Sequence, residues 1–282
     1  MNEQREESIR VLQDEARIVR KHIVRMIAGA GSGHIAPALS CADIVVALYF
    51  DVLRLDPRNP QWEDRDRFIL SKGHGCAAHY AVLAERGFFS LEVLETFCRL
   101  DSILGGHPDR RKVPGVEAST GSLGHGLSIG VGMAIAGKVD RKDYRVVVLL
   151  GDGETDEGAV WEAAMAACHF KLDNVIAIVD RNRLQVDGWT DEVMNPEPLA
   201  DKWRSFGWRV QEINGHDMAQ IVDALHVETA GSERPAVIIA NTTKGKGVSF
   251  MEGNVDWHYG AVTAEAAARA LKELESADRR ER

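Results

Sequence analysis

Two side chains that carry oxygen ligands stand one strand-helix-strand unit apart in the sequence. Asp152 follows directly after a run of apolar residues and lies between Gly151 and Gly153, and Asn182 closely follows the next apolar run. Because neighbouring parallel strands end at the same edge of a sheet, both side chains are expected there. A carboxylate oxygen, an amide oxygen and a backbone carbonyl from the following turn suit Mg²⁺, whose other positions phosphate oxygens often fill. The sequence therefore predicts a magnesium site that holds a diphosphate.

The local sequence around Asp152 supports this interpretation. The two glycines allow the backbone to approach a diphosphate closely, and the helix expected to begin near Gly158 can direct its positive end toward an anion. A structural alternative stays open from these residues alone, because Asp commonly caps a helix and Asn commonly fills a turn. The spacing of the pair, with a glycine on each side of the acid, favours the binding site.

Composition narrows the class of protein. The 282 residues are 45% hydrophobic and carry a net charge of −9, which indicates a globular chain with a proper core and argues against a nucleic-acid partner. The N-terminus is charged and no apolar run reaches the roughly 20 residues that span a bilayer, so a soluble, cytoplasmic protein without a membrane partner is expected. The four cysteines form no CxxC pair and are expected to be reduced core thiols.

Hydrophobic periodicity predicts an α/β fold in which helices sandwich a parallel sheet. Strands and helices alternate, and the apolar runs show no period of two, which is typical of strands buried on both faces. We expect one domain over residues 1–262 and a C-terminal helix and tail over 263–282. The expected strands are 67–70, 145–150, 175–179, 208–213 and 236–240. The expected helices are 9–29, 40–53, 73–85, 91–100, 123–138, 159–169, 199–206 and 218–227, with a long ordered loop over 101–120.

The stretch GDGETDEGAVWEAAMAACHFKLDNVIAIVDRNRLQVDG, residues 151–188, closely resembles the corresponding stretch of the transketolase family. The resemblance covers nearly the whole chain and implies the thiamine-diphosphate-binding fold. It implies that Gly151, Asp152, Gly153 and Asn182 bind the cofactor, and that Asp152, Asn182 and the backbone carbonyl of Leu184 hold Mg²⁺, for which Ca²⁺ or Mn²⁺ can substitute.

Four histidines in Gly-rich or loop segments also match the family. They are His34 in GSGHIAP, His74 in SKGHG, His107 in GGHPD and His258 in DWHYG. The resemblance implies that all four are catalytic residues where sugar oxygens meet the cofactor, and that His74 also contacts the cofactor. An imidazole that titrates near neutral pH suits proton transfer to and from those oxygens. A solvated loop side chain is the alternative, whereas His22, His79, His169 and His226 lie in helical patterns and are expected to be structural.

Other positions follow from the same resemblance. The segment TGSLGHG is similar to the family loop that contacts the aminopyrimidine, which assigns Gly121 and Leu123 to cofactor binding; helix initiation is the alternative. Glu157 matches an acid in a carboxylate network that couples two active sites, which makes it a catalytic candidate, and Glu162 is assigned to cofactor binding. A solvated Glu favoured by the helix dipole remains the other interpretation of Glu157. Lys72, Ser122 and His125 depart from the common family pattern.

The chain corresponds to only the first third or so of a full-length transketolase. We therefore expect the N-terminal subunit of a split enzyme that transfers a two-carbon ketol group from a ketose, expected to be a sugar phosphate, to an aldose through thiamine diphosphate. The expected partner carries the pyrimidine-binding and C-terminal domains, in an α₂β₂ assembly. The alternatives are a subunit of a 2-oxo acid dehydrogenase or deoxyxylulose-phosphate synthase, and a non-catalytic homologue.

Overall fold

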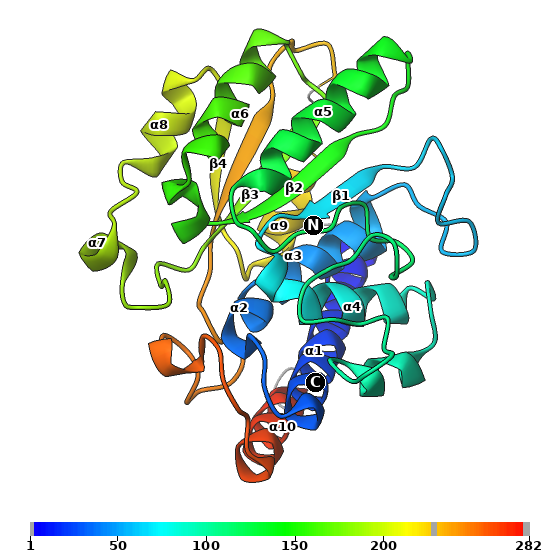
Figure 1. The fold of residues 1–282 in the computed structure, drawn as a ribbon, viewed down its shortest axis with the longest axis vertical. Coiled ribbons are helices and arrows are strands. Elements are labelled where there is room, and N and C mark those ends of the chain that lie inside the picture. The colour runs from blue at the N-terminus through cyan, green and yellow to red at the C-terminus, as the bar shows by residue number, and fades with distance from the viewer. Residues whose placement is uncertain (1–2, 227–229, 279–282) are drawn as a thin grey trace.

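The computed structural model describes residues 3–226 and 230–278, in which one parallel β-sheet lies between two layers of helices (Figure 1). The five strands run in the order β1-β2-β3-β5-β4, and every neighbouring pair is parallel. Their bounds are Arg67–Leu70 for β1, Val146–Gly151 for β2, Val175–Arg181 for β3, Arg209–Asn214 for β4 and Ala236–Asn241 for β5. The expected α/β fold with a sandwiched parallel sheet is confirmed.

Helices cover both faces of the sheet. One layer holds α1 (Glu3–Ala30), α2 (Ile35–Ser40), α3 (Ala42–Ala47), α4 (Cys76–Glu85), α9 (Met218–Leu225) and α10 (Ala264–Asp278). The other holds α5 (His125–Val139), α6 (Gly158–His169) and α8 (Leu199–Ser205). Alternate residues of a strand face opposite layers, so in β2 Val147 and Leu149 join the first core whereas Val146 and Val148 join the second.

Most expected elements match to within two residues, whereas the helix expected over 9–29 already begins at Glu3. The helix expected from residue 40 already begins at Ile35. Pro37 is tolerated there because it lies in the first turn, where backbone N–H groups have no intrahelical partner to lose. This helix is interrupted at Cys41 and ends in a π-helical turn, Leu48–Val52. The segment expected as helix 91–100 forms only a 3₁₀ helix, Leu91–Thr96, and the short α7, Thr190–Val193, was not expected.

The C-terminal helix lies in the same core as the N-terminal one. Ala270 and Leu274 of α10 are fully buried in the cluster that includes α1, and the two helices cross at one end of the molecule (Figure 1). The expected C-terminal helix is present, while the tail 279–282 and position 227 of the expected helix 218–227 lie outside the described residues. Within those residues, no helix has the length and apolar character needed to cross a membrane.

The expectation of four core thiols is correct for two of them. Cys41 and Cys76 are buried and Cys168 is half-buried, but Cys98 is exposed, and all four are free. Cys98 adopts a positive φ of 56° in the loop after the 3₁₀ helix. Its apolar sequence context therefore did not indicate burial, because the segment does not form the expected helix.

Candidate active site

A cavity of about 330 Å³ opens at the carboxyl ends of β1, β2, β3 and β5. Parallel sheets place ligand sites at this edge, because the loops that follow the strands converge there. The lining residues are His34, Pro37, Lys72, His74, His107, Gly121, Leu123, Gly151, Asp152, Gly153, Glu154, Asn182, Leu184, Gln185, Val186, Asp187, Lys244 and His258. Every residue that the sequence assigned to the site, except Glu157 and Glu162, lies in this lining.

Asp152 is held at the end of β2 with its carboxylate almost excluded from solvent. The side chain is 3% exposed and accepts hydrogen bonds from the backbone N–H groups of Gly153 and Arg183. Burial, followed by the charge of Asp180, raises the pKa of Asp152 to about 6. A bound cation would stabilise the ionised form of Asp152, which burial disfavours.

Asn182 and Leu184 lie beside Asp152 in the turn after β3. The side-chain oxygen of Asn182 accepts a hydrogen bond from the N–H of Leu184 at 3.1 Å, and the carbonyl oxygen of Leu184 accepts one from Lys244 Nζ at 2.7 Å. No group of three or more His, Cys, Asp or Glu side chains suited to a metal occurs in the described part of the chain. One carboxylate, one amide and one carbonyl fit a cation that takes its remaining ligands from phosphate oxygens.

Lys244 places a buried positive charge against this turn. Its side chain is 1% exposed, and Nζ also donates to the carbonyl of Gln185 at 3.1 Å and contacts His258 Nδ1 at 2.6 Å. Burial and the charge of Lys72 lower its pKa to about 8. Lys244 forms no ion pair with a carboxylate of the described residues, so a negatively charged ligand in the cavity would compensate it.

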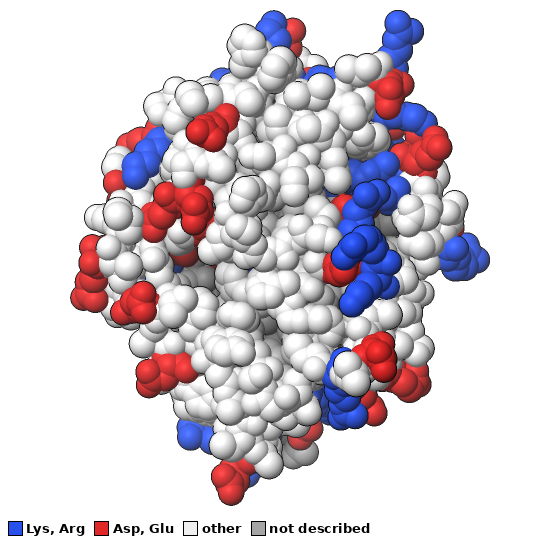
Figure 2. Space-filling view, in the orientation of Figure 1, with Lys and Arg blue, Asp and Glu red and all other residues white. Residues whose placement is uncertain are grey.

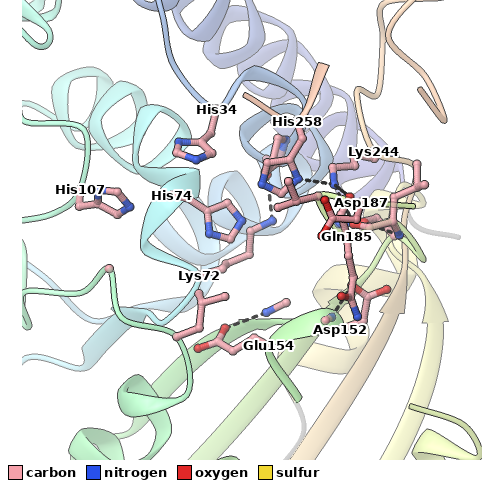
Figure 3. A pocket seen from close by; sticks show the side chains of 18 residues that line it. His34, Lys72, His74, His107, Asp152, Glu154, Gln185, Asp187, Lys244 and His258 are labelled. Atoms are coloured by element: carbon pink, nitrogen blue, oxygen red, sulfur yellow. Dashed lines mark hydrogen bonds between the residues drawn. The ribbon is translucent and has the colours of Figure 1, made fainter. Parts of the chain in front are cut away.

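The four loop histidines gather across the cavity from Asp152 and Glu154 (Figure 3). The ring centroid of His34 lies 5.3 Å from that of His74, 5.9 Å from that of His107 and 5.6 Å from that of His258. They come from four separate segments, since His34 precedes α2, His74 follows β1, and His107 and His258 lie in long connections. The fold thus brings together residues that are more than 220 positions apart in the sequence.

These imidazoles are neutral at neutral pH, contrary to the expected titration near pH 7. Burial is the main cause, and it lowers the pKa of His34 to about 4 and that of His258 to about 3. Burial also lowers the pKa of His107 and, more strongly, that of His74, with nearby Lys72 adding to the effect at His74. A neutral ring offers one N–H donor and one acceptor nitrogen.

The loop that contains Gly121 and Leu123 closes the cavity beside His107. A side-chain carbon at Gly121 would lie 3.2 Å from the His107 ring, so glycine allows the loop to approach the ring closely. Gly124 has a φ of +83° and directly precedes α5. A side-chain carbon at position 124 would lie 2.7 Å from a side-chain carbon of Glu157. Glycine is therefore needed at this position both for its positive φ and for the close approach of Glu157.

Of the acidic residues that follow Asp152, Glu154 is buried, whereas Asp156, Glu157 and Glu162 are exposed. Glu157 precedes α6 and Glu162 lies on its outer surface; both are exposed and outside the cavity lining. Glu154, which the sequence did not single out, is 2% exposed and accepts hydrogen bonds from Gly124 N, Gly151 N and Ser71 Oγ. The position of Glu154, three residues after Gly151 in the same turn as Asp152, could have indicated that it belongs to the site.

The sequence also missed both lysines as site residues. Lys72 is a buried residue of the cavity lining, and its Nζ forms an ion pair with Asp180 and donates to the carbonyl of Pro37 at 2.9 Å. Its position two residues after β1 and two residues before His74 could have indicated the site, as could the position of Lys244 three residues after β5.

A second cavity of about 330 Å³ adjoins the first through His34, His74 and His107. The described residues that line it are those three histidines with Ile27, Ser32, Gly33, Cys76, Ala77, Phe97, Cys98, Gly106 and Tyr259. None of these is Lys, Arg, Asp or Glu. The second cavity is therefore suited to an uncharged part of a ligand.

Comparison with known proteins identifies the family of the chain. Residues 11–279 match the family described as "Transketolase, thiamine diphosphate binding domain". One of the subunits of the apulose-4-phosphate transketolase of Phocaeicola vulgatus is 49% identical over 90% of this chain and 90% of its own length. The 6-deoxy-6-sulfo-D-fructose transketolase subunit SqwG of a Clostridium species is 45% identical over 94% of this chain and 96% of its own length.

Solved transketolases share the fold over almost the whole chain. The Campylobacter jejuni enzyme superimposes with a TM-score of 0.88 at 35% identity, covering 98% of this chain and 43% of its own. The Leishmania mexicana enzyme gives a TM-score of 0.88 at 32% identity, covering 94% of this chain and 41% of its own. The chain thus spans about two fifths of these two solved enzymes.

Proposed function

The chain belongs to the transketolase family as a thiamine diphosphate binding domain, and on that premise we propose that it is the cofactor-holding subunit of a two-subunit transketolase. The proposed reaction transfers a two-carbon ketol group from a ketose to an aldose. One observation carries the proposal: Asp152, Asn182 and Leu184 share a single cavity with the four loop histidines. The two relatives described above match the chain over nearly their own length and are named as transketolase subunits, which supports a division of the enzyme between two chains.

The residues around Asp152 fit Mg²⁺ and a diphosphate. Asp152 would provide a carboxylate oxygen, Asn182 its amide oxygen and Leu184 its carbonyl oxygen, which Lys244 now contacts. Lys244 would then neutralise part of the diphosphate charge, while Gly121 and Leu123 would face the rest of the cofactor. When bound, thiamine diphosphate supplies the carbanion chemistry.

The histidines would orient the sugar through hydrogen bonds. Lys244 donates to His258 Nδ1, so the neutral His258 ring carries its proton on Nε2. His258 Nε2–H can therefore donate to a sugar oxygen. His34, in the middle of the group, can hold a hydroxyl between its own ring and that of His107, and the low pKa values keep these rings from repelling one another as cations.

The proposed substrates are sugars with an anionic end, expected to be sugar phosphates. One relative named above belongs to a transketolase for apulose 4-phosphate and another to a transketolase for a sulfo-sugar. Since no Lys or Arg occurs among the described residues that line the second cavity, the anionic end would have to be bound by residues of the partner subunit.

The partner is proposed to cover the outer surface of α5 and α6. Ile129, Val139, Met165 and Phe170 are 36%, 74%, 51% and 53% exposed there. Figure 2 shows that charged side chains are sparse along the middle of the face where these helices lie. An apolar surface of this kind is typical of an interface, and a partner chain bound there would cover Glu157 and Glu162, so their proposed roles depend on the assembled enzyme. An α₂β₂ assembly is part of the proposal.

The test is to isolate the tagged chain from its native cells and identify the polypeptide and cofactor that accompany it. We expect a second chain and thiamine diphosphate, and we expect the complex to transfer a ketol group from ketose phosphates. Activity only with 2-oxo acid donors would overturn the proposal in favour of another enzyme of the same cofactor. A biological effect that survives Asp152→Ala would favour a non-catalytic homologue. The cytoplasmic location expected from the sequence is checked by fractionating the same cells.

A further inference from the structure

His216 lies outside both cavities, in the turn between β4 and α9, yet both of its ring nitrogens are hydrogen-bonded. Nδ1 lies 2.7 Å from Asp43 Oδ2, and Nε2 lies 2.8 Å from the backbone nitrogen of Thr243. The His216 side chain is 11% exposed and that of Asp43 is 10% exposed. The ring therefore connects α3 with the segment that follows β5.

The two contacts select one protonation state of His216. A backbone N–H can only donate, so Nε2 must accept from Thr243 and carries no proton. The carboxylate of Asp43 accepts, so Nδ1 carries the proton and the ring is neutral. Asp43 is itself fixed by Arg20, whose Nη1 and Nη2 donate to its two oxygens at 2.9 Å and 2.6 Å. Burial alone would raise the pKa of Asp43, but the charge of Arg20 and the His216 hydrogen bond outweigh it and hold the pKa far below its ordinary value.

The segment that His216 contacts carries Lys244 into the candidate site. Thr242 donates its N–H to the carbonyl of Arg181 at 3.1 Å, and Gly245 donates to that of Ala36 at 3.1 Å. Thr243 lies between them, and its N–H would lose its partner without the imidazole. Lys244 then contacts the Leu184 and Gln185 carbonyls and His258 Nδ1. A buried ammonium reaches three acceptors only if the backbone that carries it is held in place.

We propose that His216 is a positioning residue: by accepting the Thr243 N–H, and with its own ring oriented by Asp43 and Arg20, it sets the backbone from which Lys244 reaches Leu184 and His258. The inference deepens the proposed function, because Leu184 is in the proposed magnesium shell and His258 in the proposed sugar site. Its first test, amide hydrogen exchange over residues 242–246, needs neither cofactor nor partner. Failure of the proposed function would therefore leave this test unaffected.

Two substitutions separate the two contacts of the ring. His216→Gln can place an amide oxygen near the position of Nε2 and keep the acceptor for Thr243, whereas His216→Asn keeps a donor for Asp43 and removes that acceptor. In the full chain we expect His216→Asn to increase amide hydrogen exchange over residues 242–246 by about 10-fold or more and His216→Gln to change it little. Affinity for thiamine diphosphate with Mg²⁺ should fall by about 10- to 100-fold in the Asn variant and recover in the Gln variant.

His226 provides a matched control, because its Nε2 lies 2.7 Å from Asp51 Oδ2, but its ring is 53% exposed and far from this segment. His226→Asn should leave exchange over residues 242–246 unchanged. Equal exchange in the two His216 variants, or no change in either, would overturn the proposal. If both variants fail to fold, ¹⁵N NMR spectra of the unsubstituted chain test the proposal instead. The proposal requires a proton on His216 Nδ1 and a coupling across the hydrogen bond from the Thr243 N–H to His216 Nε2. A proton on Nε2 would exclude the proposal.

Discussion

Lys72 and Asp180 form an ion pair that solvent does not reach, with side chains that are 1% and 0% exposed. Asp180 also accepts hydrogen bonds from Ser40 Oγ, at 2.6 Å, and from Thr242 Oγ1. The pair therefore joins the segment after β1, the end of β3, α2 and the segment after β5. These four segments carry residues of the candidate site, so the pair supports the site from behind.

Removing one member of this pair should destabilise the fold. Lys72→Met leaves the Asp180 carboxylate buried without its cation, and such changes typically cost about 3–5 kcal/mol. The free energy of unfolding in urea at pH 7 measures the effect. Lys171→Met is the control, because Lys171 pairs with Glu233 where the two side chains are 61% and 65% exposed, and breaking exposed pairs costs under about 1 kcal/mol. Equal losses in the two variants would contradict the argument.

Asp152→Asn should separate cofactor binding from folding. The substitution removes the charged ligand that the proposed metal needs, so calorimetry should detect no magnesium-dependent binding of thiamine diphosphate. It relieves the burial of a charge and its repulsion by Asp180, but it leaves the N–H of Gly153 or of Arg183 without an acceptor. The free variant should therefore stay folded, with a free energy of unfolding within about 1–3 kcal/mol of that of the unsubstituted chain. Retained magnesium-dependent binding would show that the metal lies elsewhere.

His34→Gln should impair the transfer reaction without weakening the cofactor complex. His34 lies among three other imidazoles and makes no contact with Asp152 or Asn182 that would fix the diphosphate. Loss of a hydrogen-bonding group that orients the sugar should lower turnover by about 10²-fold, because small misplacements of a reacting group carry losses of that size. The assay uses a ketose phosphate donor and the complex of the chain with its partner. A parallel loss of cofactor affinity would instead place His34 in the cofactor site.

The sequence predicted the parts of the site that follow local rules. Asp152 and Asn182 could be placed because buried strands precede them and parallel strands end at one edge. The histidines were identified through the family resemblance, and their loop positions gave only weak support. The structure adds that the four rings meet.

The missed residues depend on contacts that connect distant segments. Lys72 requires Asp180 for its charge, Glu154 requires Ser71 and Gly124, and Lys244 requires the turn after β3. None of these partners lies at a helical or strand spacing, so periodicity could not indicate them. The expected titration of the histidines near pH 7 was wrong for the same reason, because their burial results from the assembled cavity.

His79 should make the fold sensitive to acid. Burial lowers its pKa to about 3, and while Nε2 lies 2.7 Å from Tyr49 Oη, Nδ1 has no hydrogen-bond partner in the described residues. Below the pKa of about 6.5 in the unfolded chain, the unfolded state binds a proton that the folded state excludes. Stability is therefore present above pH 6.5 and falls, by about 1.4 kcal/mol per pH unit from this residue, as the pH decreases toward 3.

His79→Gln tests this contribution, since Gln does not titrate. Urea unfolding of both proteins between pH 4 and 8 gives the dependence of stability on pH, and the slopes rather than the absolute values are compared. The variant should show a shallower loss of stability below pH 6.5. Identical slopes would show that His79 is not the group responsible.

Met165→Lys should leave the chain folded but prevent its assembly with the partner. Met165 is 51% exposed on α6, within the apolar surface shared with α5, and a charge there would have to be buried in the proposed interface without a counter-charge. Val11→Lys is the matched control, because Val11 is similarly exposed, at 49%, on α1 in the other helical layer. Size-exclusion chromatography with the partner should show a complex for the control and separate chains for Met165→Lys, with circular dichroism unchanged in both. A complex that forms equally well with both variants would place the partner on a different surface, because a lysine buried at position 165 without a counter-charge would oppose binding on α6.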